Sequence, residues 1–108
     1  MQEIGNNDSI TVVVDDDGVV VARGDVDLAG GPVLEQAILL REGAGPVTID
    51  LSEIDFIDSS GLRSLLGASR RAQERGQDLV LRSPSAGVTR LLALTGTTDL
   101  FRLVDTET

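Results

Sequence analysis

The chain has 108 residues, of which 41% are hydrophobic and 25% are charged, as is typical of one globular domain with a single core. It contains no His, Cys, Lys, Tyr or Trp, which excludes histidine bases, thiolate nucleophiles, phosphate-binding lysines and Cys/His zinc sites. The formal net charge of −9 argues against nucleic acid as a partner, because binding its phosphates requires basic patches.

The chain also lacks the apolar segments of membrane and exported proteins. No apolar run approaches the roughly 20 residues that span a bilayer. Met1–Ser9 lacks the basic and apolar regions of a signal peptide. We therefore expect a cytoplasmic protein without direct membrane insertion.

Two β-branched runs near the N-terminus predict a hairpin. Ser9–Val14 and Val19–Arg23 are separated by three aspartates and a glycine, a common turn signal. The aspartates are also compatible with a metal loop, but no ligand pattern of calcium-loop length follows them, which favours a solvated turn. The polar residues before the hairpin, Met1–Asp8, are expected to be frayed.

The first predicted helix follows Gly24-Asp25-Val26-Asp27, where the second strand ends. Gly30-Gly31-Pro32 leads into it, because proline is favoured near the first position of a helix. Gly43 stands where a carboxyl-terminal cap is expected. The apolar face of this helix is formed by Val33, Leu34, Ala37, Ile38 and Leu40.

The most informative stretch is Pro46–Arg75, in which a strand leads into a second helix. The strand alternates, with Val47, Ile49 and Leu51 on one face and Thr48 and Asp50 on the other. The helix places Leu62, Leu65, Leu66, Ser69 and Ala72 on one face, and Arg63, Arg70, Arg71 and Glu74 on the opposite face. Between strand and helix lies Asp58-Ser59-Ser60-Gly61.

The rest of the chain continues the same alternation of strands and helices. Gly76 ends the second helix, and Asp78–Arg82 is predicted to be a strand. A short third helix ends at Gly96, and Leu100–Val104 is predicted to be an edge strand. No linker or internal repeat divides the chain, so residues 1–108 are expected to form a single domain.

The order β-β-α-β-α-β-α-β predicts an α/β fold with a small mixed β-sheet, a hairpin at one end and helices mainly on one face. Strand–helix–strand units of this length form parallel pairs. The polar Thr48 and Asp50 agree with a second, less covered face. The predicted core contains Val47, Ile49, Leu51, Leu62, Leu65, Leu66, Leu79, Leu81, Val88 and Leu92.

Functional groups of parallel sheets gather beyond the carboxyl ends of the strands. In this chain that arrangement would bring together acidic and hydroxyl side chains: Asp25, Asp27, Asp55, Asp58, Ser59, Ser60, Ser83 and Ser85. Several chemical interpretations of this cluster are open.

Three interpretations as a receiver, a hydrolase or a nucleotide-binding protein are poorly supported. An aspartyl-phosphate receiver would use Asp50 or Asp58, but receivers balance their acidic magnesium ligands with a lysine, which this chain lacks. A hydrolase combining Asp25 or Asp27 with Asp55 or Asp58 would lack a positive group to stabilise an oxyanion. Nucleotide binding has neither a GxxxxGK[ST] loop nor a lysine. We therefore expect no catalytic residue, metal or cofactor.

The adjacent serines leave two interpretations open. Ser59 and Ser60 can act as helix N-caps, each worth ~1 kcal/mol. Alternatively, a serine here can carry a phosphate, because the amino end of a helix tolerates negative charge. On the pattern alone, capping is the more frequent role.

The segment Ile49–Leu66, IDLSEIDFIDSSGLRSLL, resembles the signature of the STAS family and, within it, of the bacterial anti-anti-sigma factors, also called anti-sigma factor antagonists. Gly24-Asp25-Val26-Asp27 resembles the Gly-Glu-Leu-Asp segment of the family, and Leu91-Leu92 with Gly96 and a final strand also match. The likeness extends over nearly the whole chain in element order. Its specific part is the Asp-Ser-Ser-Gly-Leu core.

The resemblance implies that Ser59 is phosphorylated by a cognate anti-sigma factor that is also a serine kinase. In the family, the unphosphorylated protein binds the anti-sigma factor and frees a sigma factor, phosphorylation ends this interaction, and a serine phosphatase resets it. Such a domain is a switch rather than an enzyme. The implied partner-binding residues are Asp25, Asp27, Asp58, Ser59, Ser60, Gly61, Leu62 and Arg63.

Two points qualify this expectation. Arg63 stands where many members of the family have a small residue, so the docking surface of this helix differs. An alternative role within the family is that of a STAS subunit in a stressosome-like or transporter-associated assembly, which would require separate partner chains.

Overall fold

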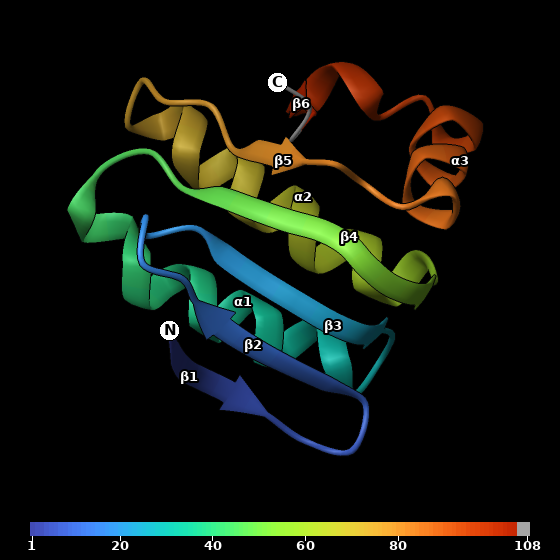
Figure 1. Cartoon of the computed structure of the whole chain (residues 1–108). Helices are drawn as coiled ribbons and strands as arrows, with labels where there is room; N and C mark the ends of the chain where they lie inside the picture. The colour runs from blue at the N-terminus through green and yellow to red at the C-terminus, as the bar shows by residue number, and fades with distance from the viewer. Residues whose placement is uncertain (106–108) are drawn as a thin grey trace.

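The computed structural model describes residues 1–105, which form a six-stranded sheet and three α-helices (Figure 1). The strands are β1 (Gln2–Asn6), β2 (Ile10–Val14), β3 (Val20–Val26), β4 (Thr48–Ile57), β5 (Val80–Arg82) and β6 (Arg102–Val104). The helices are α1 (Gly30–Arg41), α2 (Ser59–Glu74) and α3 (Ala86–Thr95), with short 3-10 helices η1 (Glu42–Ala44) and η2 (Thr98–Leu100). The strands lie side by side in chain order.

The sheet is mixed, as predicted. β1, β2 and β3 pair antiparallel, whereas β3, β4, β5 and β6 pair parallel. Figure 1 shows α1 and α2 together behind the sheet, so that the opposite face of the strands is not covered by these helices. Among residues 1–105, no helix is long and apolar enough to cross a membrane.

The prediction that Met1–Asp8 is frayed was wrong, because residues Gln2–Asn6 form edge strand β1. Gln2 lies opposite Val14, and a bulge interrupts the register between Glu3 and Gly5. The hairpin β2–β3 therefore lies inside the sheet and not at its end. Backbone pairing defines this strand, and its only partly buried apolar residue packed against the core is Ile4.

Nine of the ten predicted core residues are buried, and the exception is Leu66, which is only partly buried. At about 100° of rotation per residue, Leu66 lies about 40° beyond Leu62, at the margin of the face that α2 buries. Asp50, predicted on a less covered face, is itself only 5% exposed. An ion pair with Arg82, described below, compensates for the burial of this carboxylate.

Candidate functional site

α2 begins directly where β4 ends, with Asp58 as the only residue between them. Asp58 has extended backbone geometry, and its Oδ1 accepts a hydrogen bond from the Gly61 N–H at 3.0 Å. A carboxylate in this position satisfies one of the free N–H groups of the first turn. The interpretation of the serines as N-caps was therefore wrong, because Asp58 is the cap.

Both serines follow the cap in the first turn of α2. Ser59 is exposed and Ser60 is partly buried. Neither hydroxyl makes a hydrogen bond with any other of residues 1–105. The Ser59 hydroxyl is thus accessible and has no structural role within this part of the chain.

Gly61 allows the amino end of α2 to lie against the end of β3. A Cβ atom at Gly61 would lie 1.8 Å from the carbonyl oxygen of Val26, so no larger residue fits without a backbone shift. The Asp58 N–H donates to the same oxygen at 3.3 Å. The helices are also close, because a Cβ at Gly31 of α1 would lie 2.7 Å from the Ser64 Oγ.

Asp27 organises the turn between β3 and α1. Its Oδ1 accepts hydrogen bonds from the Ala29 N–H at 3.1 Å and the Gly30 N–H at 2.7 Å. Asp25 lies two residues earlier, at the β3 position that is in register with Phe56 of β4. Both carboxylates therefore lie at the strand ends that carry Ser59, as the parallel topology predicted.

The structure does not extend this gathering to Ser83 and Ser85. Arg82, the last residue of β5, is in register with Asp50 of β4. β4 then continues to Ile57, seven residues or roughly 23 Å farther. The expected convergence therefore holds for β3 and β4 only.

Two residues expected to bind a partner are buried. Leu62 is 5% exposed and belongs to the core, and Gly61 is buried against β3. Gly61 and Leu62 therefore lie beneath the surface that carries Ser59. Arg63 is exposed, as expected.

Sequence reasoning missed two exposed apolar side chains at this end of the molecule. Leu28, in the turn before α1, is 77% exposed, and Phe56, near the end of β4, is 52% exposed. Phe56 is one of only two aromatic residues in the chain. Its rarity, together with its place just before Ser59, is the signal that could have marked it as a candidate contact residue.

A groove of about 380 Å³ runs between α1 and α2 beside the serines. Leu28 and Pro32 line it from the α1 side, and Arg63 and Arg70 from the α2 side. Ser60 also lines the groove. Because it is open, rimmed by side chains of mixed polarity and adjacent to Ser59, it is suited to a polypeptide partner rather than to an enclosed small molecule.

Ion pairs hold the two helices at this spacing. Arg71 of α2 donates to Glu35 of α1 and to Glu42, each at 2.9 Å. Burial opposes the charge on Arg71, but the hydrogen bonds and charges of both glutamates outweigh it and raise the pKa of the guanidinium. Arg75 adds a contact of 3.3 Å to Glu42. These contacts connect α1 and η1 to α2 at this end of the groove.

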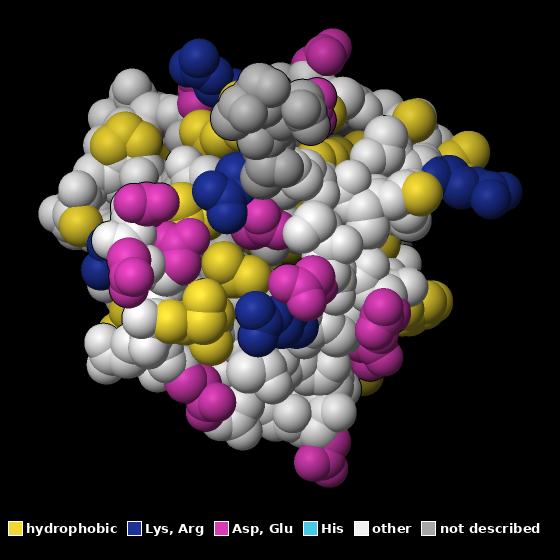
Figure 2. Space-filling view, viewed as in Figure 1, with side chains coloured by type: hydrophobic (Ala, Val, Ile, Leu, Met, Phe, Trp, Pro, Cys, Tyr) yellow, Lys and Arg dark blue, Asp and Glu magenta, His cyan; other side chains and the backbone are white. Residues whose placement is uncertain are grey.

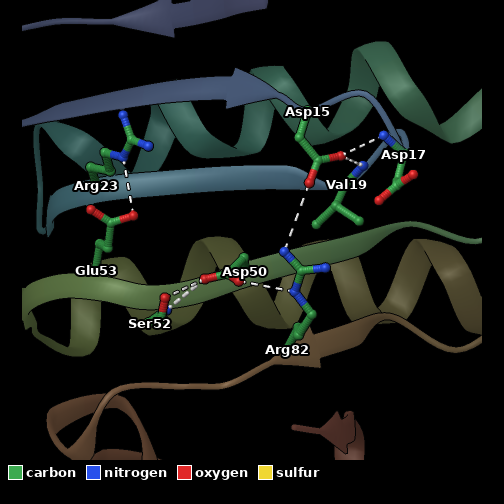
Figure 3. Close-up of polar contacts among 8 residues, drawn as sticks. All are labelled: Asp15, Asp17, Val19, Arg23, Asp50, Ser52, Glu53 and Arg82. Atoms are coloured by element: carbon green, nitrogen blue, oxygen red, sulfur yellow. Dashed lines mark hydrogen bonds and ion pairs between the residues drawn. The ribbon is translucent and has the colours of Figure 1, made fainter. Parts of the chain in front are cut away.

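A second polar cluster lies on the sheet face away from α1 and α2 (Figure 3). Asp50 Oδ1 accepts hydrogen bonds from the backbone N–H and the hydroxyl of Ser52, and its Oδ2 accepts from Arg82 Nε at 2.9 Å. Arg82 also approaches Asp15 at 3.8 Å. Both carboxylate oxygens of Asp50 accept hydrogen bonds, and the bond from Arg82 links β4 to β5.

The surroundings of Asp50 shift its titration. Burial alone would raise the pKa of this carboxyl, but hydrogen bonds from Ser52 and from Arg82, with the Arg82 charge, outweigh burial and lower the pKa. Arg23 and Glu53 form a second, more exposed ion pair on the same face at 3.2 Å (Figure 3).

The same sheet face also carries apolar side chains. Figure 2 shows them near the middle of the face, with acidic and basic side chains around them. Val13 and Val21, which are in register on β2 and β3, are each 7% exposed and lie outside the main core cluster. Within residues 1–105, no group of three or more His, Cys, Asp or Glu side chains is arranged to hold a metal ion.

Comparison with known proteins identifies relatives of this chain. The chain is 37% identical over 106 residues to an anti-sigma-F factor antagonist, RsfB, of Mycobacterium tuberculosis, covering 92% of this chain and 84% of the relative. It is 30% identical over 91 residues to the anti-sigma-B factor antagonist of Listeria monocytogenes, covering 82% and 79%. The crystal structure of an anti-sigma factor antagonist from Mycobacterium paratuberculosis superposes with a TM-score of 0.70 at 36% identity, covering 93% and 89%.

A family comparison gives the same result. The family described as "Mlab, STAS domain" matches residues 11–105, which begin within β2 and include β3 through β6 and all three helices. The match agrees with the element order and with the resemblance of the segment around Ser59. The chain therefore belongs to the STAS domain family.

Proposed function

We propose that this protein is an anti-sigma factor antagonist whose binding to an anti-sigma factor is switched off by phosphorylation of Ser59. In the unphosphorylated state it binds an anti-sigma factor that has serine kinase activity, and a sigma factor is released. A serine phosphatase restores the binding state. The protein acts in the cytoplasm as a substrate and switch, and not as an enzyme. The names of its relatives support the antagonist role.

The observation that carries the proposal is the state of the Ser59 hydroxyl. It is exposed at the first position of α2, and no hydrogen bond to residues 1–105 engages it. The helix is capped independently by Asp58. A kinase can therefore modify Ser59 without removing an interaction that the fold requires.

The electrostatic environment supports a change in binding rather than in folding. A phosphate adds about 1.5 to 2 negative charges. The helix dipole favours such a charge by ~0.3–1 kcal/mol, so α2 remains folded. Asp58 adjoins Ser59, and Asp25 and Asp27 lie at the neighbouring strand end. A docked partner would have to desolvate the phosphate beside these carboxylates, which lowers its affinity.

The test is incubation of the purified protein with ATP and the kinase-type anti-sigma factor encoded nearest to it, followed by mass mapping of the phosphate. Wild type and Ser60→Ala should be modified on Ser59, whereas Ser59→Ala should not be modified. Binding measured by calorimetry should be retained in Ser59→Ala and lost in Ser59→Asp. A phosphate mapped to Ser60, or tight binding by Ser59→Asp, would contradict the proposal.

A further inference from the structure

Ser59 and Arg63 are one turn apart on α2. Four residues rotate a helix by about 400° and advance it by about 6 Å, so these two side chains are neighbours on its surface. Side chains of a helix lean toward its amino end, which directs Arg63 toward Ser59. An acidic group placed four residues before a basic one is the more favourable order.

Arg63 has no carboxylate partner among residues 1–105, although the chain contains 18 Asp and Glu residues. Its side chain is exposed and lines the groove next to Ser60. By contrast, Arg71 of the same helix and Arg75 at its C-cap form ion pairs with Glu42. The guanidinium of Arg63 is thus available in the unmodified protein.

We propose that Arg63 is the counter-ion of the phosphate on Ser59, so that phosphorylation also withdraws this guanidinium from partner binding. The inference rests on the proposed phosphorylation of Ser59 and adds a residue that regulates its effect. A guanidinium binds phosphate oxygens through charge-assisted hydrogen bonds, which are stronger than neutral ones.

The pair changes the modified surface in two ways. It offsets the repulsion between the phosphate and Asp58, whose carboxylate is held in place by the Gly61 N–H. It also engages the Arg63 guanidinium, which lies beside Ser60 in the groove and would otherwise be free to contact a partner. A partner that approaches the unmodified protein finds a free Arg63, whereas after modification it finds a phosphate and an arginine already paired.

The experiment places phosphoserine at position 59 during translation by codon reassignment, so that no kinase is required. Phosphorus NMR then follows the second ionisation of the phosphate as a function of pH. The other charged groups on this side of the molecule are Asp58 next in sequence, Asp25 and Asp27 at the end of β3, and Glu35 along the groove, whereas Arg70 lies farther along α2. These are the same in wild type and in the Arg63 variants.

Arg63→Ala should raise the midpoint of this titration by about 0.2–0.4 pH unit, because the dianion loses its counter-ion. Arg63→Lys should restore part of the difference. Arg70→Ala is the matched control: Arg70 is exposed and lies on the same side of α2, within about 20° of Ser59, but is about 16 Å away along the axis. It should leave the midpoint unchanged.

A second readout is the Nε–H resonance of Arg63, which should move with the phosphate titration while that of Arg70 does not. An equal midpoint in wild type and Arg63→Ala, or an equal effect of Arg70→Ala, would overturn the inference. Because the phosphate is installed without a kinase, either result is independent of the proposed function. Conversely, a failure of the kinase to modify Ser59 would refute the proposed function and leave this measurement intact.

Discussion

Gly61 provides the sharpest test of how the site is built, through the substitution Gly61→Ala. The new Cβ would lie 1.8 Å from the carbonyl oxygen, 2.6 Å from the carbonyl carbon and 2.7 Å from the Cγ1 of Val26. Two of these atoms belong to the backbone, so a side-chain rotation cannot relieve the contact. To reach ordinary contact distance, α2 or β3 must move by about 1.5 Å.

We expect this movement to cost about 3 kcal/mol, at the upper end of the usual range for overpacked sites. It separates the Asp58 N–H from the carbonyl oxygen of Val26 and loosens the close approach of Gly31 to Ser64. The loss is a large fraction of the ~5–15 kcal/mol that stabilises a typical domain. The melting temperature should fall by roughly 12–24 °C.

The assay is urea unfolding followed by far-ultraviolet circular dichroism, because a chain without Trp or Tyr gives no useful intrinsic fluorescence. Gly87→Ala is the matched control, since Gly87 lies in α3 and a Cβ there would meet nothing within 4 Å. It should leave the stability unchanged or raise it by up to ~1 kcal/mol. A Gly61→Ala midpoint equal to that of wild type would refute the reasoning.

Three further predictions concern the core and the Asp50 cluster. Leu65→Ala should lower the unfolding free energy, measured in urea, by ~2–5 kcal/mol, because Leu65 is fully buried. Leu66→Ala should lower it by less than half as much, because Leu66 is only partly buried. Equal losses would show that the buried face of α2 is misassigned. The pKa of Asp50 is lowered in the folded state, so its contribution to stability is present above the ordinary value of 3.8 and is lost as the pH falls below it. Asp50→Asn should therefore make the unfolding free energy less dependent on pH in this acidic range, which urea titrations at several pH values would measure. Arg82→Met should lower the unfolding free energy by ~1–3 kcal/mol, because it leaves the Asp50 carboxylate without its cation. The control Arg90→Met, at an exposed arginine, should stay within about 0.5 kcal/mol of wild type. Equal urea midpoints of the two variants would show that the ion pair contributes nothing.

The sequence predicted the elements whose side-chain period is clear. The change from alternation in Val47–Leu51 to helical spacing after Gly61 located the strand-to-helix junction correctly. Edge strand β1 has no comparable pattern, because it pairs through its backbone and contributes little to the core. Periodicity detects the burial of side chains and is insensitive to strands that are held mainly by hydrogen bonds.

The candidate site was predicted in part for a similar physical reason. Parallel topology indicated that the ends of β3 and β4 meet, and their register confirms it. Topology does not give strand length, however, and the shortness of β5 places Ser83 far from Ser59. The pairing of Asp50 with Arg82 could not be predicted from the sequence either, because 32 residues separate the partners and only the register of β4 with β5 brings them together.

The arrangement around Ser59 separates the groups that maintain the fold from the group that can be modified. Asp58 caps α2, Asp27 holds the turn before α1, and Gly61 permits the contact with β3. None of these interactions uses the Ser59 hydroxyl. Were Ser59 itself the cap, its phosphorylation would remove a hydrogen bond worth ~1 kcal/mol and weaken the helix that presents it. Because Asp58 is the cap, a change in binding caused by the phosphate can be measured without a confounding change in fold.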